Sequence, residues 1–171
     1  MFRNILIFLF LFTVAAISVS GEALFLYVEE RTNGEPGPFP PPVKEGIYNG
    51  LFERDFIVFD SGDKQTFDVD WKGRHFLPLI DIAKKGGADF VVALLVDARE
   101  ERGADEKITV TVKASYYLVS AESGKIIEKG DITDDNGNED DERNHEAVGF
   151  DVGMKISEFI GRSIDKYLNQ L

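Results

Sequence analysis

The sequence predicts a single α/β domain with a mixed sheet, two-layer or three-layer, and a long C-terminal helix packed on the sheet. An almost unbroken apolar run at residues 89–96 follows a double glycine. Such a run is typical of a central strand covered on both faces. Residues 108–118 and 125–132 frame a turn, as in a hairpin. Apolar residues recur at helical spacing over residues 144–171, which indicates the long helix.

The first half of the chain reads as strand, helix, strand. Residues 23–28 are continuously apolar and predict a strand near the sheet centre. Residues 29–42 are rich in Pro and Gly, which indicates a connector, with a proline-rich ligand motif as the alternative. A helix over residues 42–54 and a short strand over 56–59 follow, so a parallel crossover is expected. The helix prediction depends on four spaced apolar residues, Val43, Ile47, Leu51 and Phe52.

Residues 64–75 are the least regular interior stretch, and their alternating apolar residues allow a short extra strand or an edge ribbon. Residues 78–85 predict a short helix, with Pro78 in its first turn and Gly86 as its left-handed cap. The central strand at residues 89–96 starts directly after that cap.

The second half predicts an antiparallel hairpin, an acidic loop over residues 134–142 and the last helix. Gly149, Gly153 and Gly161 interrupt this helix. Each glycine lowers helix stability by about 1 kcal/mol relative to alanine, so close packing of the helix on the sheet is expected. The predicted order of elements is βαβαββα, a parallel half joined to an antiparallel hairpin.

Residues 1–20 have the layout of a secretory signal peptide. Arg3 precedes an apolar run over residues 5–17, and small residues follow at Ser18, Ser20 and Gly21. The run is shorter than the roughly 20 residues of a membrane span, which argues against the alternative of an uncleaved anchor. We expect cleavage after Ser20, or else after Ser18, leaving residues 21–171 as a single globular domain without a stable membrane span. The chain has no cysteine, so it has neither a disulfide nor a lipoprotein acceptor thiol.

The charge of the chain excludes some partners. The net charge is −12, and loss of Arg3 with the signal peptide would make it −13. Phosphate backbones and anionic lipid surfaces repel so acidic a chain, so no nucleic acid is expected as a partner. A periplasmic or secreted location, with an envelope or periplasmic protein as the partner, agrees with these features.

Three motifs resemble a known superfamily. They are Gly87-Ala88-Asp89-Phe90-Val91-Val92 after a short helix, Leu51-Phe52-Glu53-Arg54 before an apolar strand, and the hairpin turn from Tyr117 to Ile126. Together they resemble the TolB N-terminal-like superfamily, whose relatives include the curli secretion protein CsgG, the flagellar protein FlgT and the penicillin-binding-protein activator LpoB. The resemblance covers most of residues 23–132.

This resemblance implies an exported, non-enzymatic module that binds other envelope proteins. Two features depart from the family pattern. Glu29-Glu30-Arg31-Thr32 replaces the usual polar continuation after the first strand, and the lipoprotein cysteine of several members is absent. The partner therefore cannot be carried over from the family, and no family binding residues map onto this chain.

Catalytic signatures are weak. His75 and His145 are the only histidines and are far apart in sequence, with no zinc motif around them. The chain has no Gly-x-Ser-x-Gly elbow, no reactive thiol and no phosphate-binding glycine pattern. A hydrolase that uses paired carboxylates remains an alternative, and it predicts a deep cleft holding a carboxyl group of raised pKa.

The acidic segment Asp131–Glu142 is the candidate metal site. Its oxygen ligands fall at positions 1, 3, 5 and 12 of a calcium-loop frame. Asn136 stands at position 6, where the frame requires glycine, and Gly137 follows one place late. A solvated acidic turn before a helix explains the same residues. The proposed ligands for Ca²⁺ are Asp131, Thr133, Asp135 and Glu142.

A second group of residues is a candidate for partner binding. A tryptophan beside charges in a loop can be a binding hot spot, or it can cover the core. The candidates are Asp68, Asp70, Trp71, Arg74 and His75. The leading hypothesis is an exported, soluble adaptor or scaffold of the cell envelope that acts through protein–protein contacts. Calcium binding and carboxylate hydrolysis are the alternatives.

Overall fold

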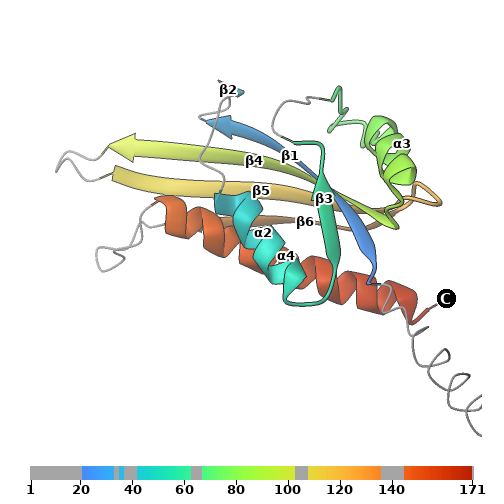
Figure 1. The fold of residues 1–171 in the computed structure, drawn as a ribbon. Helices are drawn as coiled ribbons and strands as arrows, with labels where there is room; N and C mark the ends of the chain where they lie inside the picture. The colour runs from blue at the N-terminus through green and yellow to red at the C-terminus, as the bar shows by residue number, and fades with distance from the viewer. Residues whose placement is uncertain are drawn as a thin grey trace, which may run out of the picture.

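The computed structural model describes residues 21–32, 35–36, 42–62, 67–102, 108–135 and 145–170. These residues form one six-stranded mixed sheet and three helices (Figure 1). The predicted signal peptide at residues 1–20 and half of the connector predicted over residues 29–42 lie outside the described residues. No helix among the described residues is long and apolar enough to cross a membrane.

The sheet combines a parallel half and an antiparallel half, as predicted. Its order is β2-β1-β4-β5-β6, with β3 pairing on the outer side of β1. β1 runs parallel to β3 and to β4, whereas β4, β5 and β6 form an antiparallel meander. The strands are β1 (Ala23–Thr32), β2 (Glu35–Pro36), β3 (Ile57–Asp60), β4 (Phe90–Arg102), β5 (Ile108–Ser120) and β6 (Ile126–Asp135).

The helices cover the two faces of the sheet unequally. α2 (Pro42–Phe52) and α4 (His145–Leu168) lie on one face, and α3 (Leu77–Gly86) lies over one end of the other (Figure 1). The domain therefore has three layers at that end and two elsewhere. The predicted fold class and order of elements are confirmed, with three consecutive strands before the last helix.

Two apolar clusters hold the layers together. The larger one lies between the sheet and the helices α2 and α4, and it buries the even-numbered side chains of β4 from Phe90 to Ala98. The smaller one lies under α3 and uses the odd-numbered residues Val91 and Ala93 of the same strand. β4 is therefore buried on both faces along its first half, which explains its unbroken apolar sequence.

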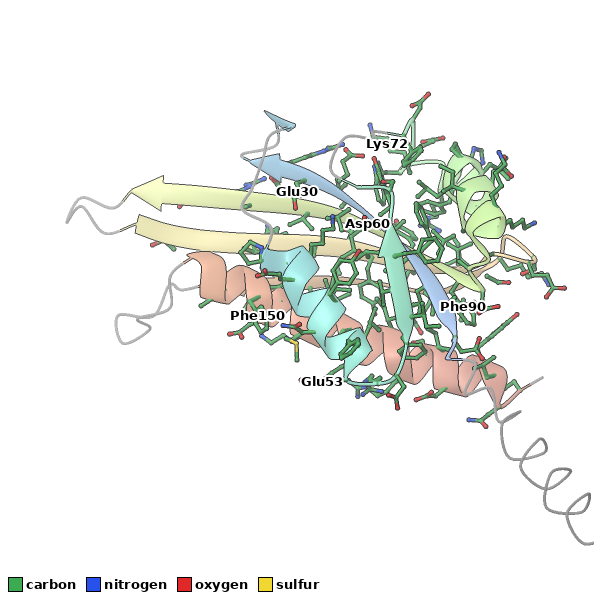
Figure 2. All side chains as sticks on the ribbon, viewed as in Figure 1. Glu30, Glu53, Asp60, Lys72, Phe90 and Phe150 are labelled. Atoms are coloured by element: carbon green, nitrogen blue, oxygen red, sulfur yellow. The ribbon has the colours of Figure 1, made fainter. Side chains whose placement is uncertain are left out.

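The α2–α4 contact depends on glycine. Each helix carries a pair of glycines four residues apart, and Gly46 of α2 faces Gly153 of α4. A methyl group on Gly153 would overlap the carbonyl oxygen of Val43, and one on Gly46 would overlap that of Phe150, which Figure 2 labels. The sequence predicted that the α4 glycines serve packing on the sheet. Instead, Gly149 and Gly153 pack on α2, because only bare backbones allow so close an approach.

Local details correct two further expectations. The left-handed cap of α3 is Gly87, with φ of 78°, and its N–H bonds back to the last turn. Gly86 is still helical and lies under the ring of Phe59. Phe52 was expected on the apolar face of α2, yet it ends the helix with 79% of its surface exposed.

Replacing Gly153 by alanine should destabilise the fold by about 3 kcal/mol, because the new methyl group forces two helix backbones apart. Gly161→Ala in the same helix is the matched control. A methyl group there meets the flexible Arg54 side chain, at 2.8 Å from its Cδ, so the helix-propensity gain of up to about 1 kcal/mol should survive. Urea unfolding followed by circular dichroism measures both variants. Equal stability changes would contradict the crossing as a constraint.

Candidate interaction surface

Trp71 anchors the loop between β3 and α3 to the sheet. Its ring stacks on Tyr27 with centroids 6.4 Å apart and meets Phe76 edge-on at 5.9 Å. The indole Nε1–H donates a hydrogen bond to Glu29 Oε2 at 2.5 Å. The packing belongs to the smaller apolar cluster, so Trp71 covers core and also satisfies its one polar atom.

Tyr27, on which the Trp71 ring stacks, is buried. Burial raises the pKa of the Tyr27 hydroxyl, the hydrogen bond that it accepts from the Phe67 N–H opposes this rise, and the negative charge of Glu29 adds to it. Phe67 also packs edge-on against the Tyr27 ring, at 5.4 Å. The loop is thus fixed at Phe67 and at Trp71.

The remaining candidate residues sit on the outer side of this anchored loop. The Asp70 carboxylate accepts a hydrogen bond from the Gly73 N–H at 2.8 Å. The backbone carbonyl of Asp70 accepts one from the His75 N–H at 3.0 Å. Arg74 takes a left-handed conformation with φ of 56° inside this turn. Asp68, Arg74 and His75 are exposed, and Lys72, labelled in Figure 2, marks the same turn beside α3. Residues 70 and 75 form an isolated bridge in place of the strand that the sequence allowed.

Beyond Trp71, the sheet presents a polar face that we call the open face. Strand alternation and register place its side chains in rows across the four long strands. No helix lies over these rows among the residues that the structure describes. The first row is Glu29, Leu95, Ser115 and Asp131, the second is Arg31, Asp97, Lys113 and Thr133, and the third is Arg99, Thr111 and Asp135.

Charges on the open face are mixed and mutually paired. Arg31 reaches Glu29 at 2.7 Å, and Arg99 Nε lies 3.5 Å from Asp97. The Ser115 hydroxyl donates to Asp131 Oδ1 at 2.5 Å. These pairs are partly exposed, and ion pairs that water still reaches contribute about 0–1 kcal/mol each. The arrangement suits protein contacts.

Three of the four proposed calcium ligands lie on this face. Asp131, Thr133 and Asp135 belong to β6, which extends three residues beyond the predicted hairpin strand, and Glu142 is outside the described residues. Asp131 and Asp135 are four positions apart on the strand, which separates their Cα atoms by roughly 13 Å. The ligand atoms of one calcium ion each lie within about 2.6 Å of the ion. Among the described residues, no three acids or histidines are placed to hold a metal. The Ca²⁺ site stays a prediction that requires the end of β6 to rearrange.

Sequence reasoning missed the carboxylate pair Glu22 and Asp89, because the two residues are far apart in the chain. Burial raises the pKa of Glu22, and the charge of Asp89 and a hydrogen bond with it raise that pKa further. The Asp89 carboxylate accepts a hydrogen bond from the Ala23 N–H at 2.9 Å. The backbone N–H of Asp89 donates to the Ala23 carbonyl at 2.8 Å. The pair therefore fastens the starts of β1 and β4, and Asp89 is exposed at that end of the sheet.

These features define a mixed α/β domain with one face sealed by helices and one face partly open. No family model and no curated protein matches the chain by sequence. The fold is similar to that of a single-residue variant of PelC from Paraburkholderia phytofirmans, a dodecamer. The TM-score is 0.56 at 16% identity, covering 83% of this chain and 90% of PelC.

Two further solved structures are similar at lower TM-scores. Lipoprotein GNA1162 from Neisseria meningitidis has a TM-score of 0.48 at 16% identity, covering 81% of this chain and 97% of its own. The LpoB C-terminal domain from Salmonella enterica has a TM-score of 0.44 at 20% identity, covering 71% and 89%. The resemblance to the TolB N-terminal-like superfamily, with its relatives CsgG, FlgT and LpoB, stays a prediction.

Trp71→Ala should destabilise the domain by about 2–3 kcal/mol, because it removes a half-buried ring from the smaller cluster and the indole hydrogen bond to Glu29 Oε2. Phe52→Ala, at a highly exposed aromatic residue, should stay within about 0.5 kcal/mol of the parent. Urea unfolding is best followed by far-UV circular dichroism, since Trp71 is the only tryptophan. An unchanged midpoint for Trp71→Ala would show that the ring serves binding alone.

Proposed function

We propose that this protein is an exported, soluble and non-enzymatic adaptor of the cell envelope that works through protein–protein contacts. The observation that carries the proposal is the fold shared with PelC at a TM-score of 0.56. PelC assembles as a dodecamer, so the same fold supports contacts between protein surfaces. The signal-peptide layout at residues 1–20 supports export.

The anchored loop supports the proposal as a contact surface. Its outward residues Asp68, Arg74 and His75 are exposed, while Asp70 fixes the turn and Trp71 fixes the loop to the sheet. A loop held in this way loses little conformational entropy when a partner binds, which favours affinity. The paired charges of the open face extend the same surface across the sheet.

The roles of the acidic residues also favour an adaptor over a hydrolase. Asp70 caps a turn, Asp89 fastens two strands, and Asp131 accepts a serine hydroxyl. Each of these carboxylates thus has a structural hydrogen bond. Glu22, whose pKa burial and the neighbouring Asp89 raise, directly precedes β1.

Site-specific photocrosslinking tests the adaptor function. A photoreactive residue at Asp68, in the anchored loop, should give a discrete adduct with an envelope protein in intact cells that export the chain. The same residue at Glu53, exposed at the end of α2 and labelled in Figure 2, is the control and should give none. Mass spectrometry identifies the adduct. If no position on the loop or the open face captures an envelope protein, the adaptor function is wrong.

Calcium binding by Asp131, Thr133, Asp135 and Glu142 is the second candidate. It rests on the spacing of these residues in the sequence, and it requires the last residues of β6 to leave the strand, because Asp131 and Asp135 lie roughly 13 Å apart along it. Calcium at one hundred times its Kd should then stabilise the fold by about 2.7 kcal/mol. Thermal melting in millimolar calcium and in chelator measures this effect, with Asp131→Asn as the variant that should lose it. Identical midpoints in calcium and chelator would contradict the metal site.

A further inference from the structure

The outer edge of β6 is long and faces no other strand of the described sheet. Among the described residues, β6 pairs only with β5, through nine of its ten residues. At the opposite side of the sheet, both ends of β1 are covered by β2 and β3. A long unpaired edge offers a row of backbone N–H and C=O groups to an incoming strand.

The backbone groups that point outward can be assigned. The Lys129 N–H donates to the carboxylate of the preceding Glu128 at 3.1 Å. The Asp135 N–H likewise donates to the carboxylate of the preceding Asp134 at 2.9 Å. Neither N–H therefore points into the β5 ladder. Alternation along a strand gives Asp131 and Thr133 the same outward direction. The short Ser115–Asp131 contact agrees, because side chains approach most closely at pairs whose backbones do not bond each other.

An exposed aromatic residue flanks this edge. Gly130 has no side chain, and a methyl group there would meet the Tyr116 ring at 2.7 Å, so this ring from β5 extends across β6. Tyr116 stacks on Phe159 of α4 at 6.4 Å, and the Arg162 guanidinium lies 5.0 Å from the Phe159 ring centre. Phe159 is 43% exposed. An aromatic ring beside an arginine is the composition typical of a binding hot spot.

We propose that the β6 edge, together with Phe159, docks an extended basic segment of a partner protein, which adds to the sheet as a strand. The proposal deepens the adaptor function and depends on it. β6 carries four acids, Glu128, Asp131, Asp134 and Asp135, against one base, Lys129. Lys155 of α4 pairs with Asp134 at 2.6 Å, so the acids still outnumber the bases. A second copy of β6 would place acid opposite acid, which is unfavourable, whereas lysine or arginine at alternate positions complements the edge.

The test uses a labelled peptide of about ten residues, the length of β6, that alternates lysine with valine. A glutamate–valine peptide is the control probe, and fluorescence anisotropy with the exported protein measures binding. We expect the basic peptide alone to bind, and to bind more weakly as salt rises. Phe159→Ala should weaken its binding about tenfold, the scale of a hot spot. Phe52→Ala, the matched exposed phenylalanine, should leave binding unchanged.

Thr133→Pro provides a second test, because it removes one outward N–H without removing a β5 ladder donor. This variant should lose most binding while keeping the parent melting temperature. If it fails to fold, the Phe159→Ala and Phe52→Ala pair decides the outcome. Binding of both peptides alike, no binding of the basic one, or equal affinity in the two phenylalanine variants would overturn the proposal. An envelope adduct at Asp68 that persists in Phe159→Ala would overturn this edge and leave the adaptor function standing.

Discussion

The structure depends on the contact of two helix backbones at the α2–α4 crossing. Gly46 and Gly153 meet the facing main chain directly, and Gly50 meets the side chain of Ser157. α2 belongs to the parallel half of the chain, and α4 follows the antiparallel meander. The crossing therefore joins the two halves outside the sheet. It also sets the distance at which both helices insert Ile47 and Ile156 into the same apolar cluster.

This crossing also determines where binding can occur. The two helices seal one face of the sheet, and its core side chains are fully buried there. α3 is short and covers only one end of the other face. The anchored loop and the polar rows of the open face occupy the part of this face that α3 leaves uncovered. β6 is the strand at one edge of the sheet. The surfaces available to a partner thus lie around the loop, the open face and that edge.

The sequence predicted the parts of this architecture that repeat along the chain. Strands β1, β4 and β5 and the three helices follow from apolar periodicity, which reports burial. The roles of Gly149 and Gly153 could not be predicted, because glycine shows a need for space without showing which neighbour needs it. The sequence left two roles open for Trp71, a binding hot spot and a residue that covers the core. Only the tertiary contacts with Tyr27 and Glu29 show how its ring is held. Phe159 fitted the apolar stripe of α4, yet it lies at the rim.

The negative charge of the β6 acids affects both pairing with another copy of β6 and pairing with a basic strand. A long unpaired edge invites pairing with another copy of itself, and charged side chains on such an edge oppose that pairing. Here Glu128 and Asp134 also occupy outward N–H groups of the following residues. In the proposed role, repulsion between like edges would oppose self-association through β6, and the same charges would lower the free energy of a basic strand beside them. Selectivity against a second copy and selectivity for a basic partner are therefore one property of this edge.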